Sequence, residues 1–195
     1  GTTCEVLCEY STENYGVILF EHDKLGKHEQ SSAGVFLSSE DPSENYLANN
    51  AGNGFIKISL PVEPFSRYSQ ASSISTEKVS SAVVFRENGT PAGNGVTLYE
   101  YEEYNEKEEG ESITTTENVP CLGGTPIGND EVSSLEIDGD YWAVVFGHAY
   151  NGEECDGKEL PYSGTCQLYR SSDPYVGDEP IQDNNISSVK VLPIK

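Results

Sequence analysis

The sequence predicts an all-β protein, and three observations support this fold class. Helical periodicity is almost absent along the chain. The apolar runs are short and rich in β-branched and aromatic residues, which suit pleated strands. Clusters of Gly, Pro, Asn, Asp and Ser separate these runs at intervals too short for long helices. The runs expected to form strands of a sandwich or barrel are Val17–Phe20, Phe55–Ile58, Ala82–Phe85, Tyr141–Phe146 and Val189–Leu192.

Length and loop composition predict two domains. A chain of 195 residues can form one large domain or two small ones of roughly 100 residues each. The best boundary is the segment 87–95, which has three Gly, one Pro and no large apolar side chain. We therefore expect two Greek-key β-sandwich domains, at residues 1–92 and 93–195. A second loop-like segment, 38–54, is expected to be a long insertion in the N-terminal half.

The charge balance indicates cations as partners. The chain has 11 basic and 33 acidic residues, for a net charge of −22, which would repel nucleic acid and anionic membranes. Solubility alone explains such acidity equally well. Residues 99–111 carry seven Glu and one Lys, and we interpret this run as a solvated hairpin face that raises the local Ca²⁺ concentration without itself holding an ion.

The cysteine content indicates an oxidising compartment. The five Cys fit no zinc-site spacing, and Cys155 and Cys166 flank a turn-rich stretch that a disulfide could close. One Cys must then stay free or pair between chains; the other three are Cys4, Cys8 and Cys121. The chain begins with Gly1 and lacks Met, as after removal of a signal peptide, although a tag scar would leave the same trace. No apolar run approaches the roughly 20 residues of a membrane span. Secretion, to the extracellular space or a secretory granule, is the expected localisation, and the sequons at Asn88 and Asn185 are compatible with it.

A short motif occurs twice, each time directly before a predicted strand. The copies are Asn129–Ser134 and Asp183–Ser188, followed by strands at 135–137 and 189–191. A weaker copy, Thr76–Ser81, lacks the leading Asn/Asp pair. An aromatic hairpin or a close variant precedes each copy, and the three are Phe20–Gly26, Tyr99–Tyr104 and Phe146–Gly152. Each unit of hairpin, motif and strand has about 45 to 70 residues, the size of a four-stranded Greek key.

On these residues the sequence resembles the βγ-crystallin superfamily, whose Greek keys combine a tyrosine-rich hairpin with a calcium motif of the form (Asn/Asp)-(Asn/Asp)-x-x-(Ser/Thr)-Ser. The similarity covers residues 95–195; in residues 1–92 it is limited to Phe20–Gly26 and Val79–Phe85. The N-terminal half is therefore either a degenerate crystallin-like domain or another β fold.

The resemblance implies two Ca²⁺ sites in which the two keys exchange ligands. Each site would take a carbonyl from the third motif position and a hydroxyl from the fifth position of one key, the second-position side chain of the other key, and a hairpin carbonyl. The first site would comprise Glu100, Glu131, Ser133 and Asn184. The second site would comprise Gly147, Asn185, Ser187 and Asp130.

The chemistry of these residue types agrees with calcium, because Ca²⁺ is a hard cation that takes six to eight oxygens. The affinities should differ, since Asn184 is neutral where Asp130 carries a charge. The alternative is a pair of Asx/Ser turns that start strands and hold no ion. The last motif residues, Ser134 and Ser188, are as well explained by hydrogen bonds to backbone.

The predicted function is that of a calcium-binding structural or interaction protein, and not of an enzyme. A calcium-dependent lectin-like or adhesive module, with itself, another extracellular protein or a glycan as partner, is the alternative, and the aromatics for it are Tyr101, Tyr104, Tyr150 and Tyr175. A secreted hydrolase is a second alternative. No Gly-x-Ser-x-Gly or His-Glu-x-x-His motif supports hydrolysis, and His22 and His148 occupy the same place in two hairpins.

Overall fold

The computed structural model describes residues 3–7, 15–20, 33–37, 55–59, 81–148, 155, 162–178 and 181–195. These residues form antiparallel strands and short 3-10 turns, which confirms the all-β class. The strands are β1 (Thr3–Leu7), β2 (Tyr15–Phe20), β3 (Ala33–Leu37), β4 (Phe55–Ser59), β5 (Ser81–Arg86), β6 (Gly95–Tyr99), β7 (Ser112–Thr115), β8 (Ser134–Asp138), β9 (Tyr141–His148), β10 (Ser163–Tyr169) and β11 (Ser188–Pro193). All five predicted strands are confirmed.

Helical structure in the described residues is limited to 3-10 turns. These are η3 (Glu103–Asn105), η4 (Leu122–Gly124) and η6 (Val176–Asp178). The described residues contain no helix with the length and apolar character of a membrane span.

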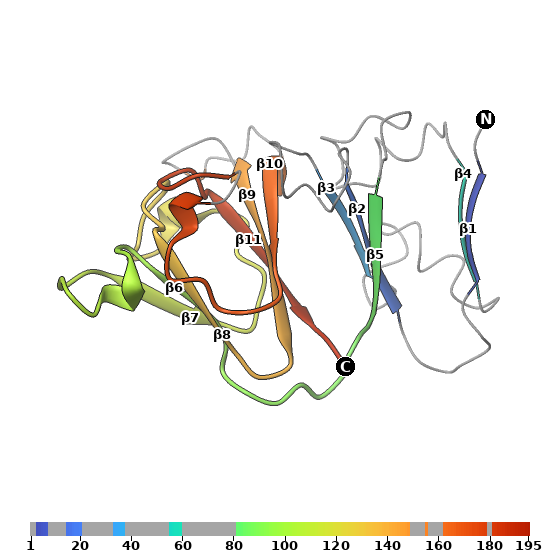
Figure 1. Cartoon of the computed structure of the whole chain (residues 1–195), viewed down its shortest axis with the longest axis horizontal. Coiled ribbons are helices and arrows are strands. Elements are labelled where there is room, and N and C mark those ends of the chain that lie inside the picture. Colours follow the sequence, from blue (N-terminus) through green and yellow to red (C-terminus); the bar gives the residue numbers. More distant parts are fainter. Residues whose placement is uncertain are drawn as a thin grey trace.

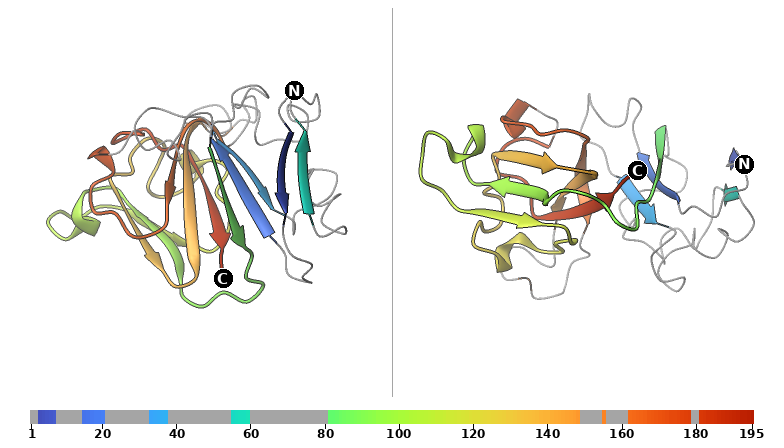
Figure 2. Two further views of the ribbon diagram at one scale, coloured as in Figure 1. Left: turned by 45° about the vertical axis from the view of Figure 1, so that its right-hand side comes forward. Right: turned by 90° about the horizontal axis from the view of Figure 1, so that it is seen from below.

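The strands form four sheets that follow one another along the molecule (Figure 1). Two three-stranded sheets, β7-β6-β8 and β10-β9-β11, face each other, and the sheet β3-β2-β5 lies on the far side of β10-β9-β11 (Figure 2). The two-stranded sheet β1-β4 lies beyond it, next to the N-terminus. The sheet β10-β9-β11 is therefore the central layer.

The two sheets of the C-terminal half exchange a segment, as two interlocked Greek keys do. In the first key β8 returns to lie beside β6, and in the second key β11 returns beside β9. The segment between β7 and β8 crosses to the opposite sheet, where Val119 forms a bridge with Val189 of β11. Reciprocally, Asp173, between β10 and β11, forms a bridge with Leu135 of β8.

Strand β9 is buried on both faces, which explains its unbroken apolar run. Ala143 and Val145 face the cluster between β9 and the sheet β7-β6-β8, together with Leu98, Leu135 and Val189. Val144 and Phe146 point the other way, because successive side chains of a strand alternate between faces. A strand in a central layer is covered on both faces and can be apolar throughout, whereas a strand at the surface needs polar side chains on the face that contacts solvent.

The second apolar cluster joins the N-terminal sheet to the central layer. Ile18 and Phe20 of β2 and Phe85 of β5 pack with Phe146 and Leu192. Backbone joins the two parts as well, since Lys195 N–H, after β11, donates to the Arg86 carbonyl of β5 at 3.1 Å. The division into domains at residue 92 stays a prediction, and the predicted loop 38–54 lies outside the described residues. The hairpin Phe20–Gly26 apart from Phe20 and the motif copy Thr76–Ser81 apart from Ser81 lie outside them too.

The predicted Cys155–Cys166 disulfide is wrong. Cys155 is bonded to Cys121, with Cα atoms 5.8 Å apart, and Cys166 is a free, buried thiol. The reason is the direction of the Cys166 side chain, which lies in the apolar cluster with Phe146 and Leu168 and is 1% exposed. Burial raises the pKa of this thiol far above its ordinary value. Nearness in sequence therefore did not decide the pairing.

Candidate metal site

The two motif copies form equivalent tight turns, each next to the hairpin of its own key. The second residue of each copy, Asp130 or Asn184, has a positive φ, of 58° and 55°, a conformation that Asp and Asn tolerate better than most residues. The fifth residue of each copy hydrogen-bonds the first strand of its own key. Ser133 N–H donates to the Tyr99 carbonyl of β6 at 3.0 Å, and Ser187 N–H donates to the Phe146 carbonyl of β9 at 2.9 Å.

The last Ser of each copy holds the hairpin of its own key. The Ser134 hydroxyl donates to the Tyr101 carbonyl at 2.6 Å and accepts from the Tyr104 N–H at 3.0 Å. The Ser188 hydroxyl accepts from the Tyr162 N–H at 3.1 Å. Both hydroxyls are fully buried and bond hairpin backbone, which leaves the fifth-position Ser of each copy as the hydroxyl that faces the other key.

One element of the second hairpin was missed by sequence reasoning. Tyr162 is the counterpart of Tyr104: the two have φ of 58° and 60°, and both rings pack edge-on against an aromatic of the preceding strand. The centroid distances are 5.7 Å for Tyr99–Tyr104 and 5.9 Å for Phe146–Tyr162. Residues 149–152 of the predicted hairpin Phe146–Gly152 lie outside the described residues. Tyr162 was missed because more residues separate β9 from β10 than separate β6 from β7, so equal spacing does not point to it.

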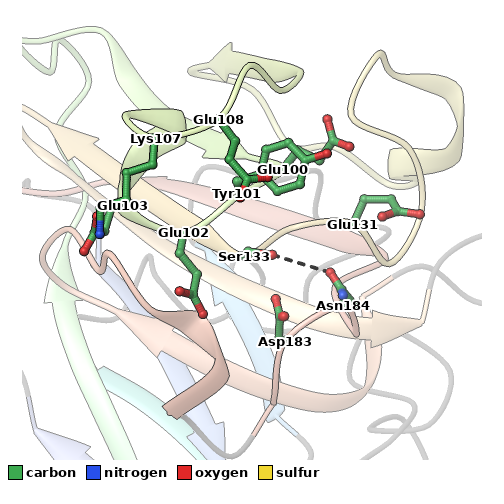
Figure 3. A pocket seen from close by; sticks show the side chains of 10 residues that line it. All are labelled: Glu100, Tyr101, Glu102, Glu103, Lys107, Glu108, Glu131, Ser133, Asp183 and Asn184. Atoms are coloured by element: carbon green, nitrogen blue, oxygen red, sulfur yellow. Dashed lines mark hydrogen bonds and ion pairs between the residues drawn. The ribbon is translucent and has the colours of Figure 1, made fainter.

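The first site lies in an open cavity of about 300 Å³ beside the first hairpin (Figure 3). Ser133 and Asn184 meet here from different keys, with the Ser133 Oγ 3.5 Å from the Asn184 Oδ1. Glu100 and Glu131 line the same cavity. Glu100 is fixed in the hairpin, since its carboxylate accepts from the Glu111 N–H at 2.8 Å. The four residues predicted for this site are therefore brought to one cavity.

The second site is the tighter of the two. The Ser187 Oγ lies 2.7 Å from the Asp130 Oδ1 and 3.1 Å from the Gly147 carbonyl oxygen. The Asn185 carbonyl is close as well, because a Cβ placed on Gly147 would be 3.4 Å from it. All four residues predicted for this site are therefore neighbours, and the carboxylate comes from the other key.

The oxygens at both sites fit a hard cation. Each set offers carbonyl, hydroxyl and carboxylate or amide oxygens, which are the ligands that Ca²⁺ takes. Asn129 adds an observation beside the second site: its Nδ2 donates to the Asp130 Oδ2 at 2.8 Å, while its buried Oδ1 has no hydrogen-bond partner. Among the residues described, no group of three or more His, Cys, Asp or Glu side chains could hold a metal ion.

The surroundings of the first site are strongly acidic. Six of the residues that line its cavity are carboxylates and one is a lysine; they are Glu100, Glu102, Glu103, Glu108, Glu131, Asp183 and Lys107. This charge raises nearby pKa values: that of Tyr101 is raised mainly by the charge of Glu100. Burial and a hydrogen bond to Glu136 raise the pKa of Tyr99 to about 12. A cavity of this sign concentrates cations.

Comparison with known proteins gives matches in the solved structures. A structure concerned with the evolution of the eye-lens βγ-crystallin domain fold is 23% identical, with a TM-score of 0.41, and the match covers 55% of this chain and 94% of that one. A βγ-crystallin domain from Clostridium beijerinckii is 24% identical, with a TM-score of 0.38 and coverage of 51% and 98%. The N-terminal domain of protein S is 18% identical, with a TM-score of 0.38 and coverage of 52% and 97%.

About half of the chain resembles a βγ-crystallin domain. The segment exchange between the two keys is observed directly in the strand pairing of this chain. No protein-family model and no curated protein matches the sequence. Another matching structure, of a clostrillin double mutant in complex with nickel, is 24% identical, with a TM-score of 0.38 and coverage of 50% and 97%.

Proposed function

We propose that this chain binds two Ca²⁺ ions, one at the first site and one at the second, and acts as a structural or interaction protein outside the cytoplasm. The observation that carries the proposal is the pair of reciprocal contacts between the keys. Asp130 reaches Ser187 at 2.7 Å, and Asn184 reaches Ser133 at 3.5 Å. An ion at either position would bridge the two keys.

In the proposed sites, each ion would be held by oxygens that lie close together in the structure. In the second site the Ser187 hydroxyl would turn its lone pairs toward the ion, while Asp130 would supply negative charge and Gly147 and Asn185 would supply carbonyl oxygens. Because the first site has the neutral Asn184 in place of Asp130, it would hold its ion more weakly by itself. The acidic cavity around the first site would partly offset this difference.

The extracellular location is part of the proposal. Its support is the Cys121–Cys155 disulfide, since such bonds persist in oxidising compartments. No catalytic role is proposed.

Calorimetry of the chelated protein tests the proposal. We expect about two Ca²⁺ per chain and a higher melting temperature with the ion, because a ligand that binds only the folded state stabilises it by mass action. In the exchanged arrangement, Asp130→Ala should weaken the ion held with Ser187, by about tenfold or more, since a charged ligand is lost. Asn184→Ala should weaken the ion held with Ser133, and by less.

Terbium luminescence or crystallographic occupancy of the two sites in each variant distinguishes the exchanged arrangement from two independent turns. If Asp130→Ala empties only the site that contains Ser133, the exchange of ligands is wrong. Unchanged melting in millimolar Ca²⁺ would refute calcium binding altogether.

A second candidate function is calcium-dependent binding of a glycan. The two exposed large aromatic side chains among the described residues, Tyr101 and Tyr175, lie on the first hairpin and on the segment that packs against it. Tyr101 also lines the first-site cavity, so an ion could order a surface that stacks on a sugar ring. A glycan array with and without EGTA tests this function, and binding that is absent or unaffected by EGTA would exclude it.

A further inference from the structure

The two sites are supported by equivalent backbone hydrogen bonds. Leu122 N–H donates to the carbonyl of Ser187 at 2.8 Å, and Val176 N–H donates to the carbonyl of Ser133 at 3.0 Å. Leu122 begins η4 in the first key and Val176 begins η6 in the second key. Each candidate ligand Ser is thus held by a short turn that belongs to the other key.

The residue directly before each of these donors reaches the hairpin beside the same site. Cys121, before Leu122, is bonded to Cys155 in the hairpin that follows Gly147. Tyr175, before Val176, donates its hydroxyl to the carboxylate of Glu103 in the hairpin that follows Glu100. Both turns are therefore tied to the hairpin that supplies the carbonyl ligand.

The partners of these two residues share a backbone conformation, since Cys155 and Glu103 have φ of 49° and 51°. Glu103 directly precedes Tyr104, and Cys155 lies seven positions before Tyr162; the N–H of each tyrosine bonds the last Ser of its motif copy. The same connection is thus covalent beside the second site and polar beside the first. The polar connection is exposed, since Tyr175 is 38% exposed. The Glu103 carboxylate also forms an ion pair with Lys107.

We propose that these two connections are latches that set the metal affinity of the adjacent site, and that the Cys121–Cys155 latch makes the second site sensitive to redox conditions while the first site is not. This inference rests on the proposed calcium function. In the oxidised protein the second hairpin and η4 are held together, so the Gly147 carbonyl and the Ser187 hydroxyl are already positioned when the ion arrives.

Opening the covalent latch is a two-electron reduction by a dithiol. The S–S bond of Cys121–Cys155 breaks, each sulfur leaves as a thiol after taking a proton, and the external dithiol becomes a disulfide. Cys155 is then no longer bonded to Cys121, and η4, whose Leu122 N–H supports the Ser187 carbonyl, loses its covalent anchor. Ordering these ligands at the moment of binding costs affinity, whereas the Tyr175–Glu103 latch of the first site has no bond to reduce.

The test measures each site separately in the full chain. Crystallographic occupancy over a series of Ca²⁺ concentrations reads the first and the second site separately in one protein, so neither ligand has to be removed. Cys121→Ser with Cys155→Ser should weaken the second site by about tenfold and the first by less than about twofold. Tyr175→Phe, the matched variant, should weaken the first site by about two- to fivefold, because exposed polar contacts contribute little, and should leave the second unchanged.

The comparison between sites separates a latch from general destabilisation, since a loss of fold would weaken both. Trp142 fluorescence and circular dichroism should show that each variant remains folded; if the Cys variant does not fold, the oxidised protein is titrated before and after treatment with dithiothreitol instead. Equal effects on both sites, or no effect on the second, would overturn the latches while leaving calcium binding intact. A parent protein that binds no Ca²⁺ would overturn both proposals.

Discussion

Removal of the Cys121–Cys155 bridge should destabilise the metal-free protein by about 4 kcal/mol. The two cysteines are 34 positions apart, and the bond limits the unfolded chain by closing that loop. The chain-entropy relation for a loop of this length gives about 13 cal/mol/K, which is about 4 kcal/mol at 25 °C. The variant is Cys121→Ser with Cys155→Ser.

The assay is urea unfolding in the presence of a chelator, so that no metal contributes to stability. Trp142 is the single tryptophan of the chain and lies in β9, where its ring is 5.5 Å from that of Phe85, so its fluorescence reports unfolding of the central layer. Reduction of the parent protein should reproduce the effect of the variant, and reductant should not change the variant further. A loss below about 1 kcal/mol would refute the reasoning, because the loop would then be constrained without the bond.

Three further outcomes are expected. Gly139→Ala should destabilise by more than about 1 kcal/mol, because Gly139 has φ of 93° and a Cβ there would overlap the Ala92 carbonyl, whereas Gly89→Ala, with open space around it, should be nearly neutral in the same urea assay. Cys166 should resist alkylation in the native protein and react once the protein is unfolded, as peptide mapping would show, since it is buried and its pKa is raised; rapid native labelling would contradict its placement. The pKa of Tyr99 is raised from 10.0 to about 12, so the stability that this hydroxyl contributes is complete below pH 10 and is lost as pH rises through 12. Tyr99→Phe should therefore lose less stability between pH 10 and pH 12 than the parent protein does; identical profiles of stability against pH for the two proteins would contradict the shift.

The candidate site could be predicted from the sequence to the extent that its parts are local. A motif such as Asn129–Ser134 contains its own turn chemistry, because Asp130 in the αL conformation and the strand that follows depend on a few adjacent residues. The pairing of Asp130 with Ser187 was expected only from the resemblance, and the structure brings the two oxygens to 2.7 Å.

The hairpins show where local reasoning stops. Tyr104 lies near Tyr99 in the sequence, so the first hairpin was predicted, whereas its counterpart Tyr162 is separated from Phe146 by a longer segment. Only the equivalent φ values, ring contacts and hydrogen bonds to Ser134 and Ser188 identify Tyr162 as the matching residue. Insertions change spacing along the chain without changing the contacts at either end.

By itself, the sequence determined the strands, the turns and the acidic character of this protein, because alternation, β-branching and charge are properties of neighbouring residues. Only the tertiary structure decided which distant groups meet. It placed β9 in a central layer with both faces covered, directed Cys166 into an apolar cluster and brought Cys155 to Cys121. A disulfide requires two Cα atoms within about 7 Å, and that distance depends on how whole sheets pack, which no local pattern encodes.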